Sequence, residues 1–162
     1  MKDLLDKLSS YNIFNYLLPG VLFAAFVDSL TSFHLVQKDP VVGVFLYYFL
    51  GSVVSRVGSL FVEPLLRRFN FVAFAPYEDF VRASKLDPKI DVLSEANNMY
   101  RTICALMVSI GAVALFERAS TYYPPLSTAL PWVLIVGLFA LYLLSYRKQT
   151  AYITKRIEVN QP

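Results

Sequence analysis

The chain has 162 residues, of which 56% are hydrophobic, 15% aromatic and only 17% charged, with a net charge of +3. Soluble domains usually carry about 45–50% apolar and about 25% charged residues, and a chain this short cannot enclose so large an apolar excess in a soluble core. The composition therefore indicates a membrane protein. The single cysteine, Cys104, excludes an intramolecular disulfide and argues against a cysteine-rich metal site.

The first ten residues predict a short amphipathic helix at the membrane surface, because Leu4, Leu5 and Leu8 alternate with charged side chains. Acidic residues interrupt this segment and no small-residue cleavage site follows it. We therefore expect the segment to be retained rather than removed as a signal peptide.

Four apolar stretches are long enough to cross a bilayer, whose hydrocarbon core of about 30 Å needs about 20 helical residues. We predict spanning helices over residues 13–30, 41–66, 102–116 and 131–146. Pro19 and Gly20 predict a kink in the first span. The second span is long enough to require tilt, and the turn-rich stretch 117–128 is predicted to be a loop between the last two spans.

The basic residues are distributed unevenly about these spans. Twelve lie on the side of both termini and of the loop between the second and third spans, Lys38 and Arg118 lie on the other side, and Arg56 lies within a span. Because cytoplasmic loops carry an excess of Lys and Arg, we expect both termini in the cytoplasm.

The polar segments on that side predict a helical cap. Residues 77–85 carry acids in their first turn and bases in their last, which suits a helix. Residues 91–97 have helical spacing and continue into the third span. The fold class that we expect is all-α: a polytopic membrane protein with four transmembrane helices and a small helical cytoplasmic cap. We divide the chain into four segments. Residues 1–68 hold the interfacial helix and the first transmembrane hairpin, and residues 69–101 form a cytoplasmic segment. Residues 102–146 form the second hairpin, and residues 147–162 form a helical tail.

An arginine and a glutamate lie within the second span. An arginine at the bilayer centre costs about 2.5–3.5 kcal/mol on insertion scales, so such residues face a bundle interior or water. Glu63 follows Arg56 by seven residues, about two helical turns, so we predict both side chains on one face. With Asn15 and Asp28 they are candidate pore-lining or inter-helix polar contacts. A structural polar staple is the simpler interpretation, and a pore or gate lining is the functional one. Candidate partners at similar depth are Asn12, Asn15, Asn97, Asn98, Arg101 and Arg147.

Small residues and basic residues mark two further surfaces. Gly51, Ser55, Gly58 and Ser59 form a small-residue stripe on the second span, and such stripes mark close helix contacts in lipid. The stripe predicts a packing interface, either within the monomer or between subunits. Cytoplasmic basic and amide side chains are candidates for binding a nucleotide-derived ligand or a soluble partner, although topology alone also demands such charges. These candidates are Lys85, Lys89, Asn97, Asn98, Arg101, Arg147 and Lys148.

No catalytic motif is present in the sequence. It has no phosphate-binding glycine loop and no HExxH motif, and its one histidine, His34, falls in a predicted outer loop. We therefore expect no enzymatic activity, no cofactor and no metal. The clustered positive charge suits a lipid bilayer better than nucleic acid, so we expect no direct binding to duplex DNA.

Four stretches carry a resemblance: NIFNYLLPG, RVGSLFVEPLL, YEDFVRASKLDPKIDVLSEANNMYR and YRKQTAYITKRI. They resemble small four-helix inner-membrane proteins of bacterial anti-phage defence operons, such as the membrane effector of Hailong-type systems and the membrane subunit of Kiwa-type systems. The resemblance implies a bacterial inner-membrane homo-oligomer that opens as an ion channel controlled through its cytoplasmic cap. The alternative is a non-conducting anchor or sensor that recruits a soluble cytoplasmic partner.

Overall fold

The computed structural model describes residues 12–161, and all regular structure in that part of the chain is helical. The predicted interfacial helix at residues 2–10 lies outside the described residues. The elements, with η for π-helical segments, are η1 (Ile13–Leu17), α3 (Leu18–Leu30), α4 (Pro40–Val57), η2 (Gly58–Val62), α5 (Glu63–Arg68), α6 (Tyr77–Leu86), α7 (Lys89–Tyr122) and α8 (Pro125–Asn160). Four continuous helical rods are long and apolar enough to cross a membrane: Ile13–Leu30, Pro40–Arg68, Lys89–Tyr122 and Pro125–Asn160.

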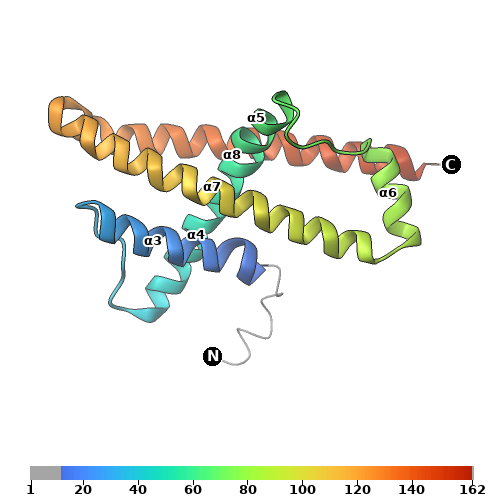
Figure 1. Cartoon of the computed structure of the whole chain (residues 1–162), viewed down its shortest axis with the longest axis horizontal. Helices are drawn as coiled ribbons and strands as arrows, with labels where there is room; N and C mark the ends of the chain where they lie inside the picture. Colours follow the sequence, from blue (N-terminus) through green and yellow to red (C-terminus); the bar gives the residue numbers. More distant parts are fainter. Residues whose placement is uncertain (1–11, 162) are drawn as a thin grey trace.

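The rod made of α4, η2 and α5 is the centre of the bundle. It packs against η1 and α3 on one side and against α7 and α8 on the other. It runs steeply across the direction that α3, α7 and α8 share (Figure 1). Val54 of this rod forms the buried core with Ala105, Leu106 and Ile110 of α7. The helix predicted to be tilted therefore contacts all three other rods, as α7 also does.

Each π-helical segment ends just before a proline. Proline has no N–H, and its ring clashes with the carbonyl four residues earlier, so a regular helix cannot pass through it undisturbed. Here the preceding turn widens: the N–H of Leu18, next to Pro19, bonds to the carbonyl of Ile13, and that of Glu63, next to Pro64, bonds to the carbonyl of Gly58. The rods therefore continue through their prolines with an altered helical phase.

The helices α7 and α8 extend well beyond the length of a span. They contain 34 and 36 residues, which at 1.5 Å per residue is about 51 and 54 Å against a hydrocarbon core of about 30 Å. Two of the segment boundaries that we predicted, after residues 101 and 146, therefore fall inside continuous helices: the first inside α7 and the second inside α8. The predicted loop over 117–128 is wrong in extent, because only residues 123 and 124 separate the two helices. Pro125 explains the short turn, since proline is favoured at a first helical position.

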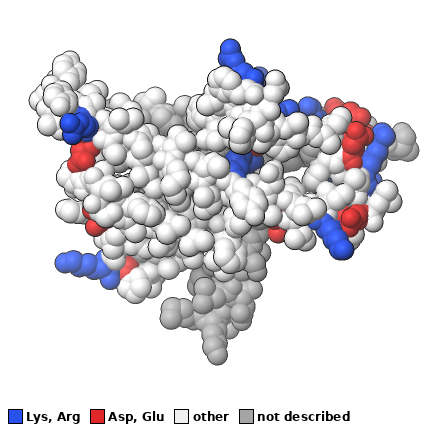
Figure 2. Space-filling view, viewed as in Figure 1, with Lys and Arg blue, Asp and Glu red and all other residues white. Residues whose placement is uncertain are grey.

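The extensions of α7 and α8 form the cap together with α6. The helix α6 packs against both, with Val81 completely buried and the Tyr77 ring 5.4 Å from that of Tyr152 in α8. The cap and the C-terminus lie at one end of the molecule, and the α7–α8 turn lies at the other (Figure 1). Charged side chains gather at these two ends, and further basic side chains lie between them, at the top centre where α5 is drawn and below it; the rest of this face is largely uncharged (Figure 2).

Candidate functional site

The rods Ile13–Leu30 and Pro40–Arg68 are in backbone contact where they cross at two glycines. A Cβ on Gly51 would lie 1.7 Å from the carbonyl oxygen of Tyr16, and a Cβ on Gly20 would lie 1.7 Å from that of Tyr47. The two backbones therefore touch, and no side chain fits between them. The sequence marked Gly51 as a packing residue, but it marked Gly20 only as a kink.

This contact brings three polar side chains together in the middle of the bundle. Asn15, Ser55 and Thr102, from three different spans, are all almost completely buried. Thr102 Oγ1 lies 2.8 Å from Asn15 Oδ1 and 3.3 Å from Ser55 Oγ, and Asn15 Nδ2 donates to Ser55 Oγ at 3.3 Å. Buried polar groups are tolerated when they are hydrogen-bonded to one another. This network therefore fixes the register of three spans.

A second polar cluster surrounds Glu63, where η2 meets α5. Its carboxylate accepts a hydrogen bond from Arg101 of α7 at 2.7 Å and lies 3.7 Å from Lys148 Nζ of α8. The side chains of Glu63, Arg101 and Lys148 are 10%, 19% and 27% exposed. Lys148 also donates to the carbonyl and hydroxyl oxygens of Ser59 at 2.6 and 2.8 Å. We call Glu63, Arg101, Lys148 and Ser59 the junction cluster, because it ties three rods together where the bundle meets the cap.

A cavity of about 370 Å³ opens beside the junction cluster, lined by Ser59, Leu60, Glu63, Pro64, Arg67, Lys148 and Tyr152. Arg67 has no carboxylate partner among the described residues, and its guanidinium lies 5.3 Å from the ring centroid of Phe74. The Nε atom of Arg101 is buried and has no hydrogen-bond partner within the same part of the chain.

Arg56 and Glu63 contact different rods, although their spacing predicted a shared face. An Arg56 NH2 group lies 3.4 Å from the hydroxyl of Tyr16 in η1, whereas Glu63 contacts α7 and α8. The π-helical segment between them explains the difference, since a π turn contains more residues than the 3.6 of an α turn. Seven residues therefore no longer return the chain to the same face.

The small-residue stripe lies at contacts between the rods of one chain. Gly51 contacts η1, and a Cβ on Gly58 would lie 3.1 Å from the Cβ of Ala105 in α7. Ser55 belongs to the buried network and Ser59 to the junction cluster. All four residues therefore serve the internal packing of the monomer.

Asp28 organises the connection between α3 and α4. Its Oδ1 accepts hydrogen bonds from the backbone N–H groups of Leu35 and Val36 and lies 3.6 Å from His34 Nδ1. Glu117 of α7 similarly accepts a hydrogen bond from the backbone of Ser32 at 2.6 Å. These acids stabilise the end of the bundle opposite the cap.

The residues predicted to bind a ligand or partner divide into two groups. Arg101 and Lys148 meet in the junction cluster, and the backbone carbonyl of Asn98 lies 2.8 Å from Thr102 Oγ1. The others do not converge on them, since their side chains are exposed along the surface of α6, α7 and α8: Lys85, Lys89, Asn97 and Arg147.

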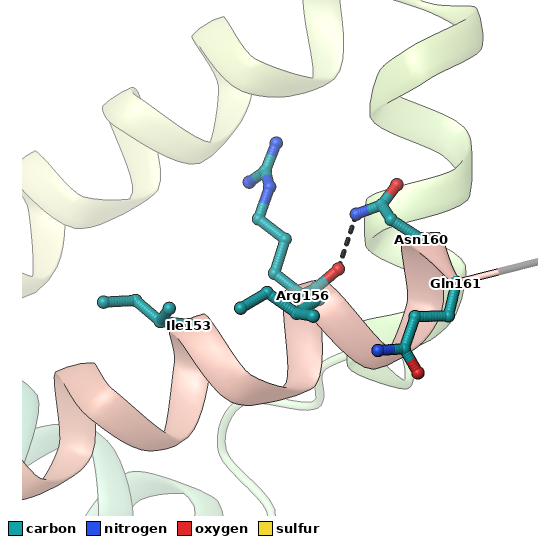
Figure 3. A pocket seen from close by; sticks show the side chains of 5 residues that line it. Ile153, Arg156, Asn160 and Gln161 are labelled. Carbon is teal, nitrogen blue, oxygen red and sulfur yellow. Dashed lines mark hydrogen bonds between the residues drawn. The ribbon is translucent and has the colours of Figure 1, made fainter.

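A groove at the end of α8 provides no convergent site. It has a volume of about 450 Å³ and is lined by Ile153, Arg156, Ile157, Asn160 and Gln161. These side chains all come from α8 and the residue after it (Figure 3), and the Asn160 amide bonds back to the Arg156 carbonyl of the same helix.

Sequence reasoning missed Thr102, Tyr16 and Tyr152 as site residues. A signal for Thr102 was present, because it lies four residues after Asn98 and next to Arg101, so it is part of a polar stripe entering an apolar helix. Tyr16 and Tyr152 carried no such signal, since tyrosines are common near membrane interfaces in any case.

The site can hold three rods in register and offer an electropositive cavity at the bundle–cap junction. Comparison of the chain with protein-family models, with curated proteins and with solved structures finds no match.

Proposed function

We propose that this protein is an oligomeric ion channel of the bacterial inner membrane that acts in anti-phage defence and is controlled through its cytoplasmic cap. The observation that carries this proposal is the continuity between spans and cap. α7 and α8 run without a break from the apolar region into the cap, where α6 bridges them. A partner that moves α6 would therefore move two spanning helices directly.

The junction cluster supports coupling of the cap to the central rod. Glu63 joins that rod to α7 and α8 in one ion-paired group, at the depth where the cap begins. On this proposal the paired arrangement is the closed state, and displacement of the cap separates the pairs. Both termini and the cap face the cytoplasm, as the charge distribution indicates.

Conduction would take place between subunits rather than through one chain. The polar side chains of the bundle interior are engaged with one another, and four helices rarely enclose a pore. The outer faces offer room for neighbours: only 6% of the most apolar stretch of α8 is buried, and both Gly111 of α7 and Gly137 of α8 have no other group within 4 Å of an added Cβ. Small residues of this kind allow helices to approach closely in lipid.

Ion flux from proteoliposomes tests the proposal. We expect the purified full-length protein to form a discrete oligomer by native mass spectrometry and to release potassium when the cap is perturbed by a partner or by substitution. Protein-free liposomes and a sample unfolded before reconstitution are the controls. A protein that remains monomeric and never conducts would contradict the proposal.

The exposed surface of the cap favours a second candidate, a non-conducting anchor that recruits a soluble partner. Leu86, Val92 and Leu93 are 87%, 65% and 67% exposed, next to the exposed Lys85 and Lys89. Apolar side chains rimmed by charge are typical of docking surfaces. This candidate predicts that reversing both lysine charges abolishes capture of the partner, whereas no variant produces flux.

A further inference from the structure

The cavity beside the junction cluster has more positive than negative charge in its surroundings. Arg67 and Lys148 line it, and Arg101, which is not a lining residue, has its guanidinium 2.7 Å from the carboxylate of Glu63. Glu63 is the carboxylate that both Arg101 and Lys148 share. One carboxylate is therefore shared by two largely buried cations, and the solvent-exposed Arg67 adds a third positive charge beside them.

Such an imbalance is costly unless a counter-charge is supplied. Buried charges are normally paired, because removal from water penalises an uncompensated ion by several kcal/mol. Arg67 has no carboxylate partner in the described part of the chain, and the buried Nε of Arg101 has no acceptor there. The exposed guanidinium of Arg67 is therefore open to an anion in the cavity, and the single carboxylate of Glu63 leaves the buried pair of Arg101 and Lys148 with one positive charge in excess.

The donor set fits a phosphoryl group. Arginine offers a planar fork of N–H donors that matches phosphate oxygens, and lysine contributes a point charge. The Tyr152 side chain, on the same wall as Lys148, adds a hydroxyl group. Glu63 also lines the cavity, and its carboxylate holds Arg101 and Lys148 in place. Because one carboxylate neutralises only one of these two cations, the net charge around the cavity stays positive.

We propose that this cavity binds a phosphoryl group, with Arg67 as its direct ligand and Lys148 and Tyr152 on the opposite wall. The cavity lies between spanning rods where the bundle meets the cap, and basic pockets at that depth commonly hold phospholipid head groups. A soluble phosphate would use the same donors. The site does not depend on conduction, so it stands apart from the proposed function.

The test measures binding to the delipidated full-length protein by native mass spectrometry. The probes are phosphatidylglycerol, phosphatidylcholine as the zwitterionic comparison, and inorganic phosphate as competitor. Arg67→Gln removes the proposed ligand without breaking an ion pair. Arg68→Gln is the matched control, because it removes the same charge from the adjacent exposed residue of α5, which does not line the cavity. Thermal melting of both variants checks that they remain folded.

We expect Arg67→Gln to weaken phosphatidylglycerol binding about tenfold or more, the scale of a charge-assisted hydrogen bond, and Arg68→Gln to change it less than twofold. Competition by phosphate that depends on Arg67 would identify a soluble phosphate as an equally good occupant, whereas its absence would identify a lipid head group. Equal weakening by the two substitutions, or equal binding of the two lipids, would overturn the proposal. No ion flux enters these measurements, so their failure would leave the proposed function untouched.

Discussion

Replacing Gly51 with alanine tests the backbone contact that positions the polar network. The added Cβ would lie 1.7 Å from the Tyr16 carbonyl oxygen, where ordinary contacts are 3.4–4 Å, so α4 and η1 must separate by well over 1 Å. The hydrogen bond between Asn15 and Ser55 is already 3.3 Å long and cannot survive that shift. Overpacking costs about 1–3 kcal/mol and the lost hydrogen bond about 0.5–1.5 kcal/mol. Alanine returns about 1 kcal/mol of helix propensity, which leaves a net loss of about 0.5–3.5 kcal/mol.

Thermal unfolding in detergent, followed by circular dichroism, measures this loss. Gly111→Ala and Gly137→Ala are matched controls, because an added Cβ meets nothing within 4 Å at either position. These two variants should melt at the wild-type temperature or slightly above it, whereas Gly51→Ala should melt several degrees lower. Equal melting of all three variants would show that α4 and η1 are not in backbone contact.

Three other predictions concern the polar clusters and the topology. Glu63→Gln should destabilise the protein by about 3–5 kcal/mol, because two largely buried cations lose their shared carboxylate. Chemical denaturation measures the change, and a loss below about 1 kcal/mol would contradict burial of the cluster. Thr102→Val should cost about 0.5–1.5 kcal/mol by removing the 2.8 Å hydrogen bond to Asn15 Oδ1, and Thr102→Ser should recover most of it. A valine variant as stable as the serine variant would exclude the hydrogen bond. In a Cys104→Ser background, a cysteine at His34 should react with an impermeant maleimide in intact cells and a cysteine at Arg82 only after lysis; the reverse result would invert the topology.

The number of helices long and apolar enough to cross a membrane could be predicted from composition and length, because each contains a continuous apolar stretch that the sequence shows directly. Pro19 was predicted to disturb its helix, and in the structure both Pro19 and Pro64 follow π-helical segments. The effect of these prolines on the helical phase was not predicted, since a sequence does not show whether a helix bends at a proline or widens into a π turn before it. The shared face predicted for Arg56 and Glu63 failed for that reason.

The partner of Glu63 could be only partly predicted. Arg101 was among its candidate partners by depth, and the two side chains form a 2.7 Å pair. Lys148 was assigned instead to a solvent-facing tail, because the sequence could not show that α8 continues straight past the junction. The turn between α7 and α8 was predicted to be too long for a similar reason: Ser, Thr and Pro favour loops on average, but here Ser120 and Thr121 bond back to the Glu117 carbonyl within the helix.

Control of ion flux by the cap is the central claim, and Tyr77→Ala tests it most directly. Tyr77 lies in α6, and its ring centroid is 5.4 Å from that of Tyr152 in the cap extension of α8. Removing the ring therefore weakens the packing of α6 on α8 and leaves the residues of the spanning stretches unchanged. Tyr122→Ala is the control, since this exposed residue ends α7 on the opposite side of the bundle. We predict that potassium flux from proteoliposomes rises several-fold for Tyr77→Ala and stays at the wild-type level for Tyr122→Ala. Identical flux from the two variants and the wild type would contradict the claim.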